Sequence, residues 1–173
     1  MITDLFKYLI RLIALVLLQV VLLNNIQFSG YINPFAYILF LLILPVHTPK
    51  LLSLVIAFII GLVVDMFGNS MGMHASACLV LAYLRPFILR IIAPRDGYET
   101  DAVPSIKDFG FKWFLIFTLM LTFVHHTVLF YLEVFRITEF FTTMLRVLTS
   151  TVASAITIII LQFLFSKQSE SRK

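Results

Sequence analysis

Six ionisable side chains stand in or beside long apolar runs, and their types could support proton transfer or metal binding. They are Asp65, His74, His125, His126, Glu133 and Arg146. His126 and Glu133 are seven residues apart and share a helix face, whereas the adjacent His125 and His126 point about 100° apart. Because diverging ligands suit one metal ion poorly, the histidines are interpreted as hydrogen-bonding groups between helices. No metal site is predicted.

Motifs for catalysis or cofactor binding are missing from the sequence. It contains no glycine-rich phosphate loop, no zinc-binding HExxH and no nucleophile elbow. Cys78 is the only cysteine and lies in an apolar run, so it predicts a buried, inert thiol and no intrachain disulfide. Without a paired nucleophile and base, the sequence indicates a protein that is not an enzyme and needs no cofactor.

The composition is that of a membrane protein. Hydrophobic residues make up 61% of the chain and charged residues 13%, with a mean hydropathy of +1.02. A soluble domain is nearer half apolar and about a quarter charged. The chain 1–173 is therefore predicted to form a single transmembrane domain. Its net charge of +4 does not indicate nucleic-acid binding, because no basic run with interleaved aromatic residues occurs.

Six apolar stretches reach or approach the length of about 20 residues that a membrane-spanning helix needs. They cover residues 5–23, 30–46, 51–67, 71–92, 111–132 and 140–165. The second is the weakest, since only residues 34–46 are solidly apolar. We therefore predict an all-α, polytopic membrane protein with six transmembrane helices. The connecting loop 93–110 has charges of both signs, and could be a solvated linker or a contact for a cytoplasmic partner.

The basic residues predict the orientation of these spans. If the N-terminus is cytoplasmic, 11 of the 13 basic residues fall on the cytoplasmic side. Only Arg136 and Arg146 then lie on the outer side. Cytoplasmic loops of membrane proteins are enriched in Lys and Arg. An arrangement with five helices would break the alternation of basic loops inside and loops with few basic residues outside. Both termini are therefore expected in the cytoplasm.

The stretch GLVVDMFGNSMGMHA, residues 61–75, combines an embedded carboxylate with regularly spaced glycines. Four of its residues stand at positions i, i+4, i+7 and i+11, namely Gly61, Asp65, Gly68 and Gly72. On one continuous helix these residues would form a stripe for close helix packing. The polar residues within 67–74 instead favour an outer turn that contains Gly68 and Gly72. Gly61 alone is then expected to pack against a neighbouring helix.

Asp65 needs a partner, because an unpaired carboxylate near the outer end of a span costs about a few kcal/mol. Arg146 lies at a similar predicted depth, so Asp65 and Arg146 form a candidate ion pair. If they pair, removing one charge should be more harmful than removing both. His74 could donate a hydrogen bond across the turn instead, and both charged groups could also extend to the surface. The sequence leaves these alternatives open.

The pattern G-x-x-x-D-x-x-G-x-x-x-G-x-H-A, with the chain length and the number of spans, resembles the rod shape-determining protein MreD family of bacteria. The residues that match the family motif are Gly61, Asp65, Gly68, Gly72 and His74. The motif of this family is not catalytic. The resemblance therefore implies a structural or partner-binding role for these residues.

This resemblance implies a non-enzymatic scaffold of the cell elongation complex in the bacterial inner (cytoplasmic) membrane. Its implied partners are the bitopic protein MreC and an assembly of actin-like MreB filaments, the peptidoglycan polymerase RodA and a penicillin-binding transpeptidase. Cell shape and lateral peptidoglycan synthesis would then depend on it. The family also has a fold similar to the substrate-binding component of energy-coupling-factor vitamin transporters.

A substrate-binding membrane subunit of a small-molecule, vitamin-type transporter is the alternative. Its solute pocket would open outward among Asp65, His74 and Glu133. Such a subunit needs a stripe of small residues on its first helix, where the transport module docks. The first predicted helix has Ala14 and no glycine, which favours the scaffold.

Overall fold

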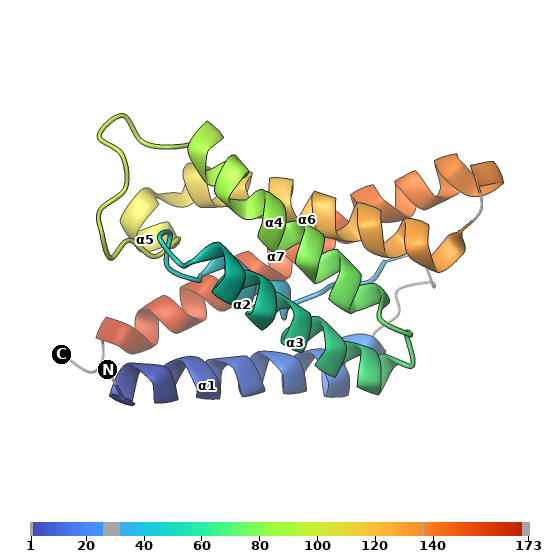
Figure 1. Ribbon diagram of the computed structural model, residues 1–173, viewed down its shortest axis with the longest axis horizontal. Coiled ribbons are helices and arrows are strands. Elements are labelled where there is room, and N and C mark those ends of the chain that lie inside the picture. The colour runs from blue at the N-terminus through green and yellow to red at the C-terminus, as the bar shows by residue number, and fades with distance from the viewer. Residues whose placement is uncertain (1, 26–31, 136, 171–173) are drawn as a thin grey trace.

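The computed structural model describes residues 2–25, 32–135 and 137–170, which form helices and their connections. Five long helices lie lengthwise in one bundle (Figure 1): α1 (Ile2–Leu17), α3 (Lys50–Gly68), α4 (Met73–Ile91), α6 (Phe111–Val134) and α7 (Phe140–Glu170). A π-helical turn, Leu18–Leu22, and a 3-10 turn, Leu23–Asn25, continue α1. We call the end at which α1 begins and α7 ends the terminal end, and the opposite end the distal end.

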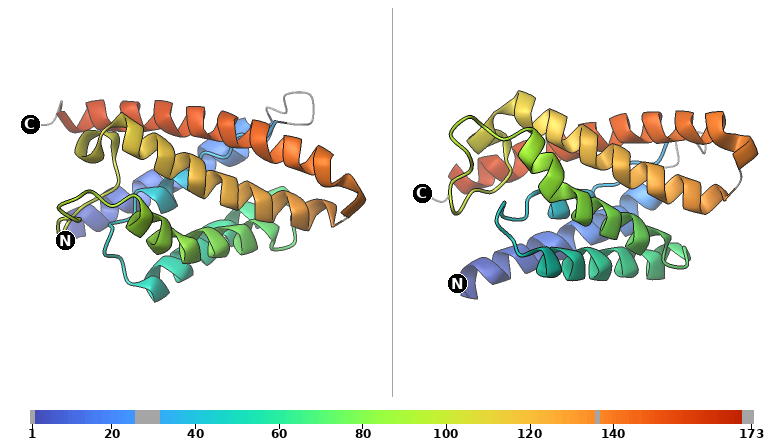
Figure 2. Two further views of the ribbon diagram at one scale, coloured as in Figure 1. Left: turned by 90° about the horizontal axis from the view of Figure 1, so that it is seen from above. Right: turned by 45° about the horizontal axis from the view of Figure 1, so that its top comes forward.

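The bundle is built from two helix pairs and α1. Figure 2 shows α6 and α7 side by side, with α3 and α4 forming a second pair on the side of α1. Helix α4 packs against both α3 and α6, and so joins the pairs. A 3-10 turn, Ile137–Glu139, precedes α7 at the distal end.

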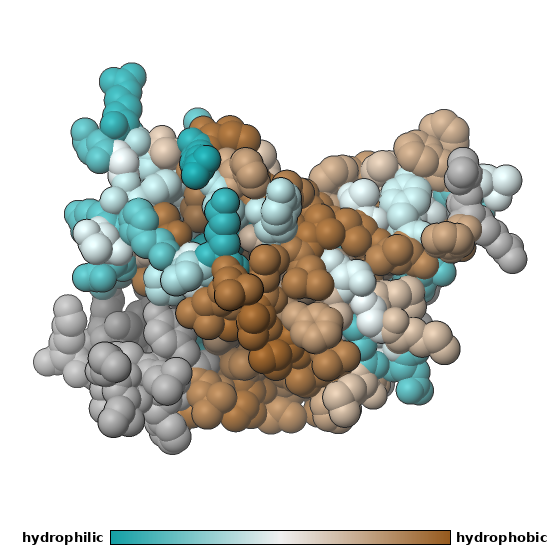
Figure 3. Space-filling view, viewed as in Figure 1, coloured by the Kyte–Doolittle hydropathy of each residue, from teal (hydrophilic) through white to brown (hydrophobic). Residues whose placement is uncertain are grey.

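The outer faces of the long helices are apolar. Among the described residues, α3, α4, α6 and the part Phe140–Leu164 of α7 are long and apolar enough to cross a membrane. The apolar helical segment Leu9–Leu22 is shorter. Figure 3 shows apolar side chains across the middle of one face, and hydrophilic ones toward the terminal end. The chain is thus an all-helical, multi-pass membrane protein.

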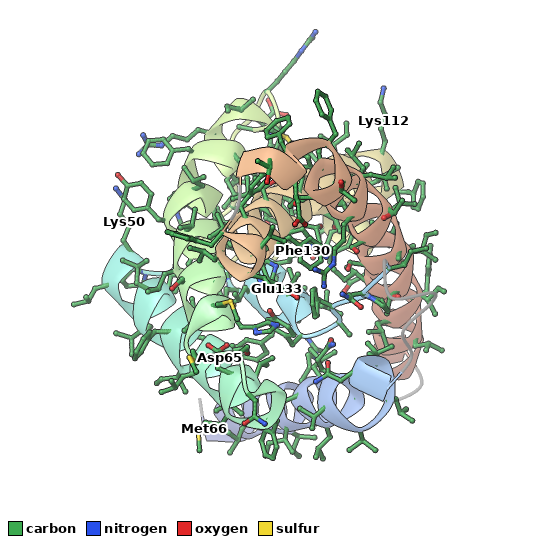
Figure 4. The ribbon with its side chains drawn as sticks, turned by 90° about the vertical axis from the view of Figure 1, so that its right-hand side faces the viewer. Lys50, Asp65, Met66, Lys112, Phe130 and Glu133 are labelled. Atoms are coloured by element: carbon green, nitrogen blue, oxygen red, sulfur yellow. The ribbon has the colours of Figure 1, made fainter. Side chains whose placement is uncertain are left out.

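The helix predicted over residues 30–46 is wrong. Residues 30 and 31 lie outside the described part, residues 33–36 are not helical, and α2 covers only Ile38–Leu42. We call residues 32–46 the central segment. Every side chain from Phe35 to Leu44 is at most 7% exposed, and Figure 4 shows this part of the chain enclosed by the long helices. The central segment returns from the distal end to the terminal end inside the bundle.

Side chains of the surrounding helices satisfy the backbone of the central segment near the distal end. Ser150 Oγ and Ser154 Oγ accept from the N–H groups of Asn33 and Phe35 at 3.1 and 2.8 Å, and Gln19 accepts from Ala36 N at 2.8 Å and donates to Pro34 O at 3.2 Å. Irregular backbone at membrane depth is tolerated only where protein groups replace water in this way. The non-helical backbone is therefore possible because polar side chains of the enclosing helices take the place of intrahelical hydrogen bonds.

Arg85 of α4 performs the same role near the terminal end. Its side chain is 3% exposed and donates to Leu42 O at 3.3 Å, to Pro45 O at 3.4 Å and to Leu44 O. These carbonyls lie at and beyond the C-terminus of α2, where helical carbonyls lack intrahelical donors and a cation is stabilised. Arg85 thus fixes the second half of the central segment to α4.

The loop 93–110 is folded against the terminal end, and is not a solvated linker along its whole length. Tyr98 Oη donates to Leu89 O, and Trp113 Nε1 donates to Ile92 O, each at 2.7 Å. The short helix α5 (Ile106–Phe109) places Phe109 with its ring centroid 4.5 Å from that of Trp113. Val46 N also donates to the loop carbonyl of Ala102 at 2.9 Å. The loop therefore holds the end of the central segment.

Candidate functional site

Helices α3 and α4 come into close backbone contact at Gly61. A Cβ atom added to Gly61 would lie 2.4 Å from the Cα of Ala75 and 2.7 Å from the carbonyl oxygen of His74. Any larger side chain would push the helices apart. Gly72 lies in the connecting turn with φ +85°, a conformation that glycine adopts readily. The predictions of a packing glycine at 61 and a turn glycine at 72 are confirmed, whereas Gly68 is the last residue of α3.

The Asp65 carboxylate caps the start of α4. Its Oδ2 accepts from Ala75 N at 2.9 Å, and its Oδ1 accepts from His74 N at 3.0 Å. Ser70 Oγ also donates to Oδ1, at 2.5 Å. The first N–H groups of a helix lack intrahelical acceptors and carry a partial positive charge, so a carboxylate there is stabilised. Asp65 is thus 5% exposed yet well hydrogen-bonded.

The imidazole of His74 completes this cap. Its Nδ1 lies 3.0 Å from Asp65 Oδ1 and 2.8 Å from Ser70 Oγ. An ionised carboxylate only accepts hydrogen bonds, so Nδ1 carries the hydrogen, and Nε2 of the neutral ring is then an acceptor. Ser, His and Asp are also the residue types of a hydrolase triad. Here, however, Ser70 donates to the carboxylate and contacts the same ring nitrogen as Asp65, so no base is placed to activate it.

The candidate ion pair between Asp65 and Arg146 is wrong. Arg146 Nη1 instead lies 3.1 Å from Oε2 of Glu133, and its Cζ lies 4.2 Å from the ring centroid of Phe130. The physical reason is that each group has nearer partners. Asp65 is satisfied by the cap of α4, and Arg146 by a half-exposed carboxylate on the neighbouring helix α6.

A cavity of about 430 Å³ opens at the distal end, and we call it the distal cavity. It is lined by the end of α1, the central segment, the α3–α4 turn, α6 and α7. Its polar lining includes Asn24, Asn33, Asn69, His74, Glu133 and Arg146. Figure 4 looks onto this end and labels Phe130 and Glu133, which line the cavity, and Asp65, which does not. The structure therefore brings His74, Glu133 and Arg146 together, whereas Asp65 lies behind His74 in the cap.

His125 and His126 are fully buried and link α6 to its neighbours. His125 Nε2 lies 2.8 Å from Tyr37 Oη of the central segment. His126 Nε2 lies 3.1 Å from Ser154 Oγ of α7. Their interpretation as interhelical hydrogen-bonding groups is confirmed. Among the described residues, no three His, Cys, Asp or Glu side chains are placed to hold a metal ion.

Sequence reasoning missed the residues that hold the central segment. Gln19, Ser150 and Ser154 are fully buried and polar. They lie within predicted membrane spans, and Gln19 and Ser154 have apolar neighbours on both sides, which is the signal that could have identified them. A polar side chain inside a span usually has a partner in the protein interior. What it binds could not be predicted, because its partners are backbone groups of a distant segment.

A second cavity, of about 510 Å³ and almost entirely apolar, lies near the terminal end between α1 and α3. We call it the α1–α3 groove. Its walls include Leu9 and Leu12 of α1, Leu52 and Ile56 of α3, and Phe40 of the central segment. Leu52 is 50% exposed, so the groove is continuous with the apolar outer face.

No protein-family model, curated protein or solved structure matches the chain. Its site is therefore interpreted from its own geometry. The motif Gly61–Ala75 builds a closed helix hairpin, and the distal cavity beside it has charged groups and hydrogen-bonding groups on its walls.

Proposed function

We propose that this protein is an MreD-type scaffold in the bacterial inner membrane. In this role it binds MreC and helps to connect MreB filaments with RodA and its transpeptidase partner during lateral peptidoglycan synthesis. The observation that carries the proposal is the α3–α4 hairpin. Gly61 forms a close backbone contact with α4, Asp65 and His74 cap α4, and Gly72 lies in the turn. The motif residues thus contact one another in the structure, which supports a structural role for the motif.

The α1–α3 groove supports the same role. A bitopic partner such as MreC presents a single membrane helix, and an apolar concave surface open to the lipid gives such a helix close van der Waals contact. Because lipid chains are as apolar as leucine, shape is what distinguishes a helix-binding surface in a membrane. The groove provides that shape beside the exposed face of α3.

Depletion of the protein in its own host tests the proposed function. The scaffold role predicts rounded or widened cells and less peptidoglycan insertion along the lateral wall, measured with a fluorescent wall precursor. Re-expression of the wild-type chain is the control and should restore both. Unchanged cell width and an unchanged insertion pattern after complete depletion would contradict the proposal.

A substrate-binding subunit of a small-molecule transporter is the second candidate. The distal cavity favours it, because its volume lies in the range of about 300–1,000 Å³ that is usual for small-molecule sites. Loss of such a subunit would reduce the uptake of one small molecule and leave the cell shape unchanged. The depletion experiment therefore separates the two candidates when uptake is measured alongside shape.

A further inference from the structure

We propose that the distal cavity binds a small organic cation, namely a molecule with one ammonium group on a short apolar or aromatic body. The inference goes beyond the scaffold role, which requires no ligand. It also gives a ligand class to the second candidate function. It rests on the charges, the hydrogen-bonding groups and the apolar walls of the cavity.

The charges around the cavity favour a cation. Glu133 and Arg146 line it, and the Asp65 carboxylate lies directly behind His74, at 3.0 Å from its Nδ1. Only Glu133 of the two carboxylates lines the cavity, but Asp65 lies close behind it, so the two carboxylates and the Arg146 guanidinium leave a net negative charge when His74 is neutral. The walls lie in part inside an apolar bundle, where such a charge acts more strongly than in water.

Two residues that line the cavity from different helices, Glu133 and His74, carry hydrogen-bond acceptors. Arg146 bonds Oε2 of Glu133, and Oε1 is the second acceptor oxygen of this half-exposed carboxylate on α6. The Asp65 cap fixes the hydrogen of His74 on Nδ1, which makes Nε2 an acceptor on α4. An ammonium group has three donors and no acceptor, so it suits this pair. Arg146 itself is held by Glu133 and stacked on Phe130, which reduces its reach into the cavity.

The apolar part of the wall suits a short hydrophobic body. Phe35, Leu129 and Phe130 line the cavity beside the polar groups. The Phe35 ring centroid lies 5.5 Å from that of His74 in an edge-to-face arrangement. An aromatic ring next to the acceptor also attracts an ammonium group through its π face. The ligand is therefore expected to place its charge near Glu133 and His74 and its apolar body against these side chains.

Titration calorimetry on the full chain in lipid nanodiscs tests the ligand class. The probes are phenethylamine, phenethyl alcohol and hydrocinnamate, which have similar bodies and carry a positive, no and a negative charge. Empty nanodiscs correct for partition into lipid. We expect phenethylamine to bind at least tenfold more tightly than the alcohol, and hydrocinnamate not to bind. Equal or tighter binding of either other probe, or no binding by any of the three, would overturn the proposal.

A matched pair of variants places the binding in the cavity. Glu133→Gln removes the carboxylate from the cavity wall, and should weaken phenethylamine binding at least tenfold. The temperature of thermal unfolding should stay unchanged, because Glu133 is half-exposed. Glu99→Gln removes an exposed carboxylate from the loop at the terminal end, and should leave binding unchanged. Equal effects of the two changes would overturn the site. Binding is measured without wall synthesis or uptake, so its failure is distinguishable from a failure of either proposed function.

Discussion

Asp65 shows how a carboxylate is stabilised in apolar surroundings without an opposite charge. Four donors surround it: two backbone N–H groups of α4, the Ser70 hydroxyl and the His74 ring. Hydrogen bonds to charged groups contribute about 1.5–3 kcal/mol each, so this set can offset the cost of burial. The carboxylate thus stabilises the helix hairpin.

The cap predicts that Asp65→Asn and Arg146→Gln act independently. Asp65→Asn should lower the free energy of unfolding by about 1–3 kcal/mol, because an amide nitrogen then meets N–H donors. Arg146→Gln should cost less, since its partner Glu133 is half-exposed. Side chains without shared partners give additive effects, so the double variant should show the summed loss in thermal unfolding. If the double variant were more stable than the single variants, the result would contradict independence and support a direct ion pair between Asp65 and Arg146.

Gly61 is the second test at this scale. Gly61→Val should destabilise the protein by about 1–3 kcal/mol or more, because the added side chain overlaps the backbone of Ala75. Gly68→Ala is the matched control, since its added Cβ would meet only the Ser70 hydroxyl, at 3.3 Å. Thermal unfolding and membrane accumulation measure both variants. A stability of Gly61→Val equal to that of the control would show that the close contact is not required.

The sequence predicted that Asp65 needs a partner, but it could not select one. Predicted depth placed His74 and Arg146 at similar levels, and helix periodicity does not report how the turn orients a carboxylate. The selection depends on the turn around Asn69 and Gly72, both of which adopt positive φ angles. This turn brings the start of α4 back over Asp65. Such a tertiary detail has no signature in hydropathy.

At the scale of elements, hydropathy predicted the long helices and failed at the central segment. The spans predicted over 51–67, 71–92, 111–132 and 140–165 correspond to α3, α4, α6 and α7. The central segment is equally apolar because it faces other helices on every side. An apolar pattern does not distinguish such an enclosed segment from a helix that faces lipid. Its irregular backbone depends on distant polar groups, above all Arg85 and Gln19.

Ser154→Ala tests the support of the central segment. The change leaves the buried Phe35 N without its acceptor and removes the contact of Ser154 Oγ with His126 Nε2. We expect a loss of about 1–3 kcal/mol in the free energy of unfolding. Thr157→Val on the same helix is the control, because Thr157 bonds only the Ala153 carbonyl of its own helix. Equal stabilities of the two variants would contradict the supporting role of Ser154.

For the whole molecule, the arrangement predicts both ends of the chain on one side of the membrane. The positions 100 and 138 are exposed at opposite ends of the bundle. Single cysteines are introduced as Thr138→Cys and Thr100→Cys in a Cys78→Ala background, and they should differ in their labelling in intact spheroplasts. An impermeant thiol reagent should label only the first, and both should react after lysis. Labelling of position 100 from outside would contradict the predicted orientation. Arg136, one of the two basic residues predicted on the outer side, lies outside the described residues.

The scaffold proposal is tested most directly by affinity purification of the tagged protein from mild detergent, with mass-spectrometric identification of what co-purifies. We predict recovery of MreC together with wall-synthesis proteins. A Leu52→Trp change, which fills the α1–α3 groove, should reduce MreC recovery at least threefold, whereas Leu145→Trp on the exposed face of α7 should not. Recovery of nucleotide-hydrolysing transport subunits in place of MreC, from the wild-type chain, would contradict the scaffold and favour the transporter.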